Sequence, residues 1–203
     1  MDTYFQEHIY PLLTPQGMDP AHPFPFISNL SLNLLVATRH DNSDHIYLNR
    51  IKVPTIGIGI PRFIAVEKGK YRYVLFEDLI ANNLEVIFPD MIIESCELFR
   101  VTRNAITEQW PDQAVDLLSM IETALQDRKF AEIVRVEVDS TMTRQHRGML
   151  ASELGIDSRK DVFTVDGIMA KRDLMEIAGI DKPELHYPPH QPLDHYKLAG
   201  DYP

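Results

Sequence analysis

The sequence predicts an α+β protein, in which a mixed or mostly antiparallel sheet packs against three to four helices. Short runs with an apolar–polar period of two, which is typical of strands, occur in neighbouring pairs. Runs with apolar residues three and four positions apart, which are typical of helices, lie between them. A doubly wound parallel fold is less favoured, because strict alternation of strands and helices is missing.

The predicted strands carry alternating patterns and end at turn residues. Gly69 lies between two of them and can adopt the positive φ of a tight turn, so a β-hairpin is expected there. In a later strand, Val134, Val136 and Val138 are expected to share one face. The expected strands span residues 30–36, 47–53, 63–66, 71–75, 97–102, 133–138 and 163–165.

The predicted helices differ in the strength of their signal. The clearest is 112–128, where apolar residues recur at helical spacing and Pro111 occupies a position that a first turn tolerates. Gly155 and Gly179 are expected to close two later helices in the left-handed conformation. The expected helices span residues 77–83, 112–128, 143–154 and 171–178.

Prolines divide the chain into a body and two arms. Residues 1–27 contain five prolines and are predicted to form an extended arm, with Phe5 and Ile9 available for packing. Residues 28–181 form the predicted body. Residues 182–203 again hold five prolines and no periodicity, which indicates a linker or an arm lying on a neighbouring domain.

Composition limits the classes of function. The chain has 203 residues, of which 44% are hydrophobic and 25% charged, as in ordinary globular proteins. Its net charge of −10 is the wrong sign for a protein that mainly clamps nucleic acid or an anionic membrane. Cys96 is the only cysteine, and neither a secretory signal nor a bilayer-length apolar run is present. These features predict a cytosolic protein.

No motif of catalysis, cofactor binding or metal binding is predicted. Residues 57–61 lack the third glycine and the following helix of a dinucleotide loop, so a flexible loop is favoured. There is no phosphate-binding Walker loop, and Cys96 has no histidine beside it in the sequence. His186, His190 and His195 cluster near the C-terminus, but without a rigid scaffold or a companion cysteine.

The charges are distributed unevenly along the chain. Residues 50–72 contain six basic residues and one acid, whereas residues 77–97 contain six acids and no lysine or arginine. The basic stretch could face a polyanion or an acidic partner domain, but a solvated hairpin is slightly favoured. The candidates for polyanion or interdomain contacts are Arg50, Lys52, Arg62, Arg100 and Arg103.

Several segments, in order, resemble the middle or head domain of bacterial polyphosphate kinases. The most distinctive is His22 to Leu34, which reads HPFPFISNLSLNL, and the match covers nearly the whole chain. Ile106, Asp90 and the loop at 54–61 depart from the family pattern. The other matching segments are residues 50–54, 61–63, 76–80, 84–89, 99–105, 135–139 and 187–189.

The resemblance implies a module of an enzyme that reversibly transfers the terminal phosphate of ATP to polyphosphate, with magnesium and a phosphorylated histidine. That histidine and most nucleotide contacts belong to C-terminal domains in the family, and no motif carrying them is present here. The head domain in the family helps to build the dimer and to line the polyphosphate tunnel. The resemblance therefore implies a non-catalytic structural or dimerisation module that binds no cofactor itself.

The implied partners are the N- and C-terminal domains of the same enzyme, a second copy of that enzyme, and polyphosphate. The implied location is the cytoplasm, or the membrane periphery in the parent enzyme. Two other readings stay open, namely a free-standing protein-interaction domain and a small metal-dependent hydrolase that uses the C-terminal histidines.

Overall fold

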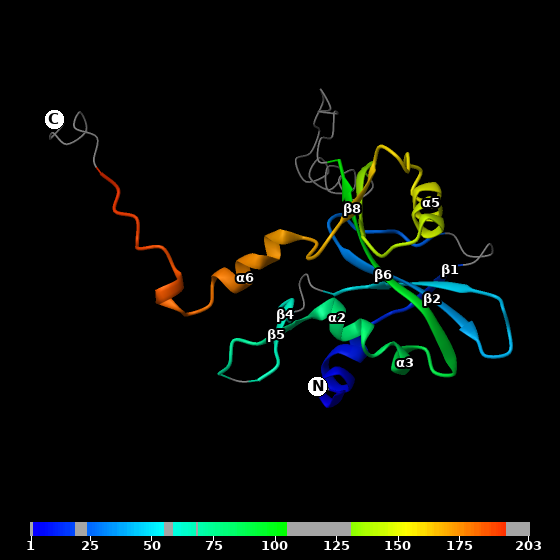
Figure 1. The fold of residues 1–203 in the computed structure, drawn as a ribbon, viewed down its shortest axis with the longest axis horizontal. Coiled ribbons are helices and arrows are strands. Elements are labelled where there is room, and N and C mark those ends of the chain that lie inside the picture. The colour runs from blue at the N-terminus through cyan, green and yellow to red at the C-terminus, as the bar shows by residue number, and fades with distance from the viewer. Residues whose placement is uncertain (1, 19–23, 55–58, 68, 105–130, 194–203) are drawn as a thin grey trace, which may run out of the picture.

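One mixed sheet forms the centre of the molecule. The computed structural model describes residues 2–18, 24–54, 59–67, 69–104 and 131–193. Within them, six strands pair in the order β1-β3-β2-β6-β7-β8 (Figure 1). Every neighbouring pair is antiparallel except β7 and β8, which are parallel. The α+β class with a mixed sheet is thus confirmed. The strands span Gln16–Met18 (β1), Leu32–His40 (β2), Tyr47–Lys52 (β3), Met91–Arg103 (β6), Ile133–Asp139 (β7) and Val162–Val165 (β8).

The predicted hairpin forms a separate two-stranded sheet of β4 (Phe63–Ala65) and β5 (Tyr73–Leu75). Gly69 lies in the turn with a φ of +81°, as expected. The predicted helix at 112–128 lies outside the described residues. The described helical segments are α1 (Asp2–Tyr4), η1 (Phe5–Ile9), η2 (Tyr10–Leu12), α2 (Phe76–Ala81), α3 (Leu84–Ile87), α5 (Arg144–Glu153), η3 (Lys171–Leu174), α6 (Met175–Ala178) and η4 (Pro183–Leu185).

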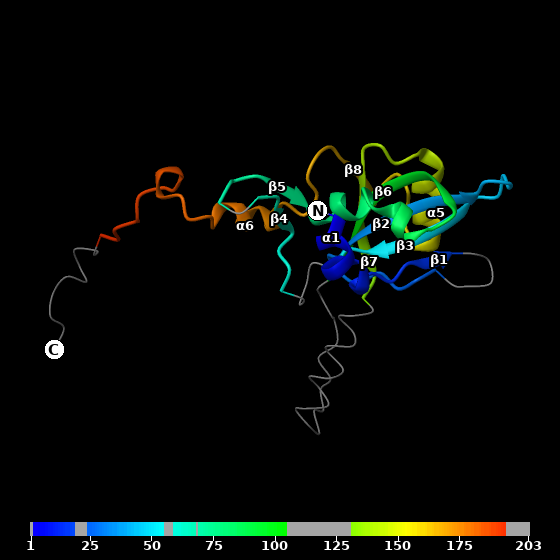
Figure 2. The same cartoon turned by 90° about the horizontal axis from the view of Figure 1, so that it is seen from below.

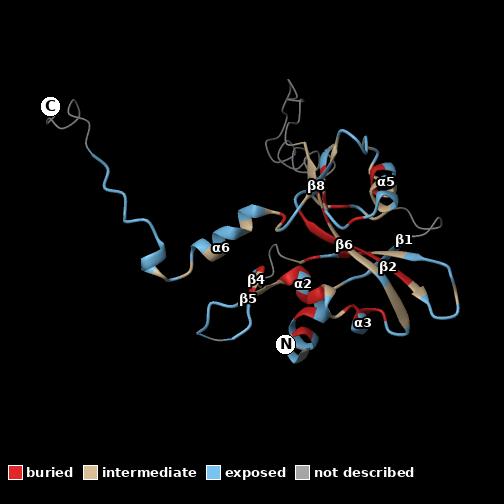
Figure 3. Ribbon diagram, in the orientation of Figure 1, coloured by how far each residue is buried: buried red, intermediate tan, exposed pale blue. Residues whose placement is uncertain are grey.

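Helices cover both faces of the sheet, so that the central strand β2 is buried on both sides from Leu32 to Thr38 (Figures 2 and 3). Successive residues of β2 point to opposite faces. Leu34 packs on one face with Phe5 of η1 and Ile80 of α2. Leu35 packs on the other face with Leu150 of α5. The two apolar clusters therefore share β2 and β6 as their common wall.

The N-terminal segment differs from the predicted extended arm. Residues 2–12 are helical, and β1 pairs with β3 at the edge of the sheet. The first proline in the sequence is Pro11, which sits at the start of η2 where a helix tolerates it. Phe5 and Ile9 are four residues apart and are both fully buried. Their packing, rather than the later prolines, determines the local structure.

Strands β2 and β6 are longer than predicted. The polar residues from Thr38 onward were expected to end the first strand, and β6 was expected to begin at residue 97. Instead β2 continues to His40 and pairs with β6 from Met91, past a register shift between Ala37 and Thr38. Such a shift interrupts the period-two pattern, which hides the continuation from sequence reasoning.

The predicted valine face of β7 is only partly correct. Val136 and Val138 are fully buried, but Val134 is 47% exposed. Thr102 lies opposite Arg135 and Arg103 lies opposite Ile133, so Val134 is left without a partner in a bulge. The extra residue shifts the alternation of side chains by one position, so Val134 does not share the face of Val136 and Val138.

Of the two helices predicted in the C-terminal part, α5 (Arg144–Glu153) is confirmed and the one at 171–178 is broken into two short segments. Thr143 caps α5 by accepting a hydrogen bond from the amide of His146, and Gly155 follows the helix with a φ of +67°. The expected helix at 171–178 is instead the short turn η3 followed by one turn of α6. Gly179 has a φ of −83°, so the expected left-handed cap is wrong there. From η3 onward the chain leads away from the sheet (Figure 1).

The buried centre of β6 predicts a large effect of core truncation. Phe99 is fully buried between β2 and β7. Phe99→Ala is expected to lower the free energy of unfolding by about 3–5 kcal/mol, since it removes a buried ring and leaves a cavity. Urea denaturation of this chain measures the change. Val134→Ala, at the exposed bulge, serves as the control and is expected to change it by less than about 0.5 kcal/mol. Equal effects would contradict the strand register.

Candidate functional site

The most extensive polar network centres on Arg62, just before β4. Its side chain is 1% exposed. Nε donates to both carboxylate oxygens of Glu77 at 3.1 Å, and Nη2 also bonds this carboxylate. Nη1 donates to the carbonyl of Met169 at 2.7 Å and to Oδ2 of Asp173 at 3.0 Å. Burial alone would lower the pKa of Arg62, but hydrogen bonds and charge attraction from Glu77, then Asp173, raise this pKa above its ordinary value.

These contacts, which we call the Arg62 clamp, join three parts of the chain. They link the hairpin to α2 through Glu77, and to the segment that follows β8 and continues into η3 through Met169 and Asp173. Ala170, in that segment, has a φ of +50°, which is uncommon for a residue other than glycine. The clamp therefore fixes the path of the chain where it leaves the sheet.

Arg50 is a structural residue of the sheet. It is 6% exposed, and its guanidinium donates to Oδ1 of Asn33 at 2.8 Å and to Oε1 of Gln16 at 2.6 Å. Both partners are neutral, and burial lowers the pKa of Arg50 to about 10. The side chain of Asn33 is itself held by Ser31. Arg50 thus connects β3 to β2 and to the residue that opens β1.

Arg100 and Lys52 differ in their surroundings. Arg100 forms an ion pair with Glu137 at 2.9 Å and donates to the carbonyl of Leu30 at 3.3 Å. Lys52 is exposed at the end of β3. Of the five candidates that the sequence predicts, the structure therefore leaves Lys52 as the exposed cation, and the arginines engage protein groups among the described residues.

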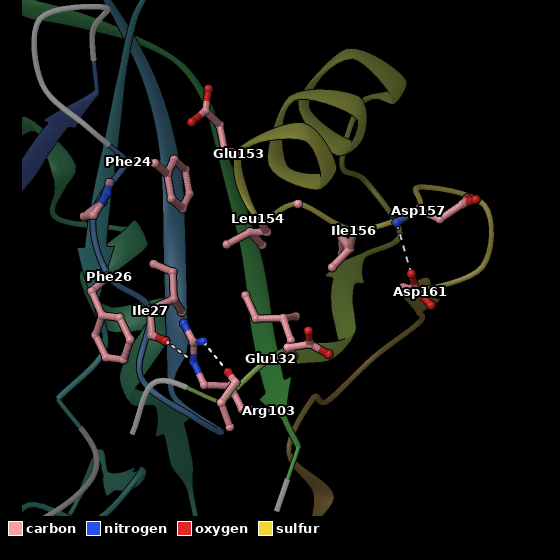
Figure 4. Close-up of a pocket in the computed structure, with 14 residues that line it drawn as sticks. Phe24, Phe26, Ile27, Arg103, Glu132, Glu153, Leu154, Ile156, Asp157 and Asp161 are labelled. Carbon is pink, nitrogen blue, oxygen red and sulfur yellow. Dashed lines mark hydrogen bonds between the residues drawn. The ribbon is translucent and has the colours of Figure 1, made fainter. Parts of the chain in front are cut away.

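Arg103 forms one wall of a cavity of about 570 Å³ (Figure 4). Its guanidinium donates to the carbonyls of Ile27 at 3.0 Å and Ala131 at 2.7 Å, and it stacks on the ring of Phe26. Burial lowers the pKa of Arg103. These contacts fasten the segment before β2 to the start of β7.

The same cavity has a negative lining. Hydrogen bonds from the backbone amides of Arg159 and Lys160 lower the pKa of Asp157 and favour its ionised form. Since carboxylates repel phosphate and Arg103 is already engaged, the cavity is poorly suited to a polyanion. The carboxylates around the cavity belong to Glu132, Glu153, Asp157 and Asp161.

A second cavity of about 380 Å³ lies between α2 and the segment around Met169, and Cys96 lines it. Burial, and then the charges of Glu97 and Asp78, raise the pKa of Cys96 to about 12. Burial and the neighbouring Glu77 also raise the pKa of Asp78. A thiol with so high a pKa is a poor nucleophile at neutral pH.

One buried contact was missed by sequence reasoning. The carboxylate of Glu97, which is 3% exposed, accepts a hydrogen bond from the amide of Thr143 at 3.0 Å and contacts Nδ1 of His146. It ties the first turn of α5 to β6. The partners lie 46 and 49 residues apart, so no local pattern reveals the contact.

The described histidines do not assemble a metal centre. His186 and His190 are exposed in the C-terminal tail, whereas His22 and His195 lie outside the described residues. In the part of the chain that the structure describes, no three His, Cys, Asp or Glu side chains are placed to hold a metal ion. Among those residues, no helix has the length and apolar character needed to cross a bilayer.

The family model of the polyphosphate kinase middle domain matches residues 1–177. The chain belongs to this family. The resemblance seen in the sequence is thus confirmed. The fold is also similar to the crystal structure of polyphosphate kinase from Porphyromonas gingivalis, with a TM-score of 0.70 and 22% identity. That match covers 95% of this chain and 27% of the other.

Curated relatives with the name polyphosphate kinase are longer than this chain. The protein from Aphanizomenon baltica is 40% identical over 202 residues, and that from Synechocystis sp. is 39% identical over 193 residues. The matches cover 94% and 90% of this chain. The chain spans 51% of the first relative and 26% of the second.

The Arg62 clamp predicts a strong dependence of stability on one side chain. Arg62→Met is expected to lower the free energy of unfolding by about 3–5 kcal/mol, because it leaves the Glu77 carboxylate buried without its cation. Lys70→Met, which removes an exposed ion pair with Glu67, is the control and is expected to cost less than about 1 kcal/mol. Chemical denaturation measures both. A small effect of Arg62→Met would mean that water already satisfies Glu77.

The raised pKa of Cys96 predicts slow thiol labelling. Because the thiolate is the reactive form, a pKa near 12 depletes it at pH 8 by roughly a thousandfold relative to an unperturbed thiol. Ellman's reagent should therefore react far more slowly with the native chain than with the urea-unfolded chain. The native rate should rise with pH up to pH 10. Equal rates in both states at pH 8 would show that Cys96 is accessible and ordinary.

Proposed function

We propose that this chain is a non-catalytic, architectural part of a polyphosphate kinase, the enzyme that reversibly transfers the terminal phosphate of ATP to polyphosphate. In this proposal the phosphorylated histidine, the magnesium ions and the nucleotide contacts belong to polypeptide outside the chain. The chain positions that polypeptide and binds no cofactor itself. Membership of the middle-domain family supports the proposal.

The observation that carries the proposal is the Arg62 clamp. An arginine at a phosphate site must keep donors free for the ligand. Arg62 instead directs its donors at Glu77, Met169 and Asp173, which come from separate parts of the chain. Such a residue holds protein segments in a fixed relation, which is what an architectural module requires.

The proposal assigns a role to each region. Residues 28–181 form the head domain, residues 1–27 lead into it, and residues 182–203 connect it to the following domains of a cytoplasmic enzyme, which is peripheral to the membrane at most. The partners are the N- and C-terminal domains of the same enzyme and a second copy of that enzyme. Lys52, as the exposed candidate, is the residue through which polyphosphate contact would be tested.

Arg62→Lys in a full-length polyphosphate kinase that contains this chain tests the architectural role. Lysine keeps the charge but loses the forked contacts, so the clamp should loosen without removing any ATP contact. We expect kcat for polyphosphate synthesis to fall about tenfold or more, since misplacement of reacting groups is costly, with KM for ATP unchanged. A raised KM for ATP with unchanged kcat would instead indicate nucleotide binding by this domain.

Lys52→Met in the same enzyme is the matched control. It removes an exposed charge without breaking the clamp, so rate and polyphosphate length should stay unchanged. A shortened product would favour direct polyphosphate contact at Lys52. Full activity of a polyphosphate kinase that lacks this domain altogether would overturn the architectural role and favour a free-standing interaction domain.

A further inference from the structure

An apolar groove lies between the β4–β5 hairpin and the tail that follows the sheet. Its volume is about 630 Å³, compared with about 570 Å³ for the cavity at Arg103 and about 380 Å³ for the one at Cys96. One wall is the hairpin and the other comes from α6 and η4, more than 100 residues later in the chain. The main apolar side chains of the groove are Tyr71, Tyr73, Ile177, Ile180, Leu185 and Tyr187.

Several of these apolar side chains are largely exposed to solvent. Tyr71 is 54% exposed, Leu185 75% and Tyr187 97%. Beyond the groove, Leu193 is 96% exposed. Single exposed apolar residues are common, but a contiguous group of this kind marks an interaction site. The groove therefore lacks a partner among the described residues.

The groove is preformed, since polar contacts hold its two walls together. The backbone amide of Phe63 donates to Oε2 of Glu176 at 3.2 Å. The ammonium of Lys182 lies over the ring of Tyr71 at 4.6 Å, and the hydroxyl of Tyr71 is 3.5 Å from the carbonyl of Asp181. The Arg62 clamp adds a contact to Asp173 next to the same wall. A preformed groove loses less conformational entropy on binding.

The position of the groove in the family indicates what occupies it. The middle-domain model ends at residue 177, within the wall formed by α6. The matches to the relatives cover 94% and 90% of this chain, so they involve the chain beyond this point, in proteins that are longer still. The groove thus lies where the middle domain ends and the next part of a polyphosphate kinase begins.

Tethering favours an occupant from the same polypeptide. Residues 188–203 span at most roughly 50–60 Å when fully extended, so anything that follows them stays close to the groove. A tether of this length keeps what it joins at a high effective concentration, above that of most free partners. Intramolecular docking therefore needs little intrinsic affinity.

We propose that this groove seats apolar side chains of the part of the polyphosphate kinase that follows the middle domain in the same polypeptide. The proposal rests on the proposed function and specifies the surface through which the architectural role is exerted. In it, Tyr73, Ile177, Leu185 and Tyr187 contact the inserted side chains.

Site-specific photocrosslinking in the full-length enzyme tests this proposal. Tyr73, which is 37% exposed, is replaced by the photoreactive residue benzoylphenylalanine. Tyr47, which is 38% exposed at the start of β3, receives the same replacement as the control. After irradiation, mass spectrometry should find the Tyr73 position joined to peptides that follow residue 203 in the same chain. The Tyr47 position should not give these products.

A second substitution tests the apolar character of the contact. Adding Ile177→Asp to the Tyr73 variant should lower the yield of that product by about tenfold or more, because an unpaired carboxylate is costly to bury. An unchanged yield would contradict the role of the groove. So would crosslinks from Tyr73 to a second copy, to polypeptide preceding the middle domain, or only within residues 1–203.

A measurement without substitutions covers the case in which a variant misfolds. Hydrogen exchange of residues 71–75 and 177–187 should be slower in the full-length enzyme than in this chain, and equal exchange would overturn the proposal. Polyphosphate synthesis is assayed on each crosslinking variant. Normal synthesis with crosslinks elsewhere would refute the groove assignment alone, leaving the architectural role to the Arg62→Lys result.

Discussion

The structure depends most on the requirement that a buried guanidinium keep its acceptors. Arginine does not lose its proton inside proteins, so a side chain that is 1% exposed must be surrounded by oxygen atoms. Arg62 obtains these from α2, from the segment after β8 and from η3. The hairpin, which forms a sheet of its own, is thereby fixed to the segment that leaves the central sheet. The same atoms set the direction in which the chain leaves the sheet.

This constraint also connects the basic and acidic stretches of the sequence at one point. The basic stretch at 50–72 and the acidic stretch at 77–97 meet in the pair of Arg62 and Glu77. Other acids of the second stretch take partners from elsewhere, as Glu94 does with Arg39 and Glu97 with His146. One pair of opposite charges thus joins the two stretches, whereas Arg50 bonds neutral groups, Lys70 pairs with Glu67 and Lys52 is exposed. A linear excess of lysine and arginine is therefore poor evidence for an anion-binding surface here.

Sequence reasoning predicted elements whose signal is local. The mixed sheet, the hairpin at Gly69 and the capped helix α5 follow from periodicity and turn chemistry within a few residues. It failed where pairing at long range decides the outcome. The bulge at Val134 and the extension of β2 to His40 depend on the register with a neighbouring strand. The N-terminal turns form because Phe5 and Ile9, which the sequence marks as available for packing, find a buried site whose other residues lie far away in the sequence.

At the candidate site, too, the sequence indicates the residue but not its distant partners. Sequence reasoning could select Arg62 as a notable cation, but its partners lie 15 and 111 residues away, so a role in phosphate contact or in packing could not be decided. The structure also joins this clamp to the groove, because Asp173 and Glu176 lie on one short segment that reaches back to Arg62 and Phe63. The side chain of Arg62 and the backbone of Phe63 thus hold the wall of the groove that contains Ile177 and Ile180. Since one short segment carries both the contacts to Arg62 and Phe63 and the apolar residues of the groove, the buried charge network helps to position the exposed apolar surface.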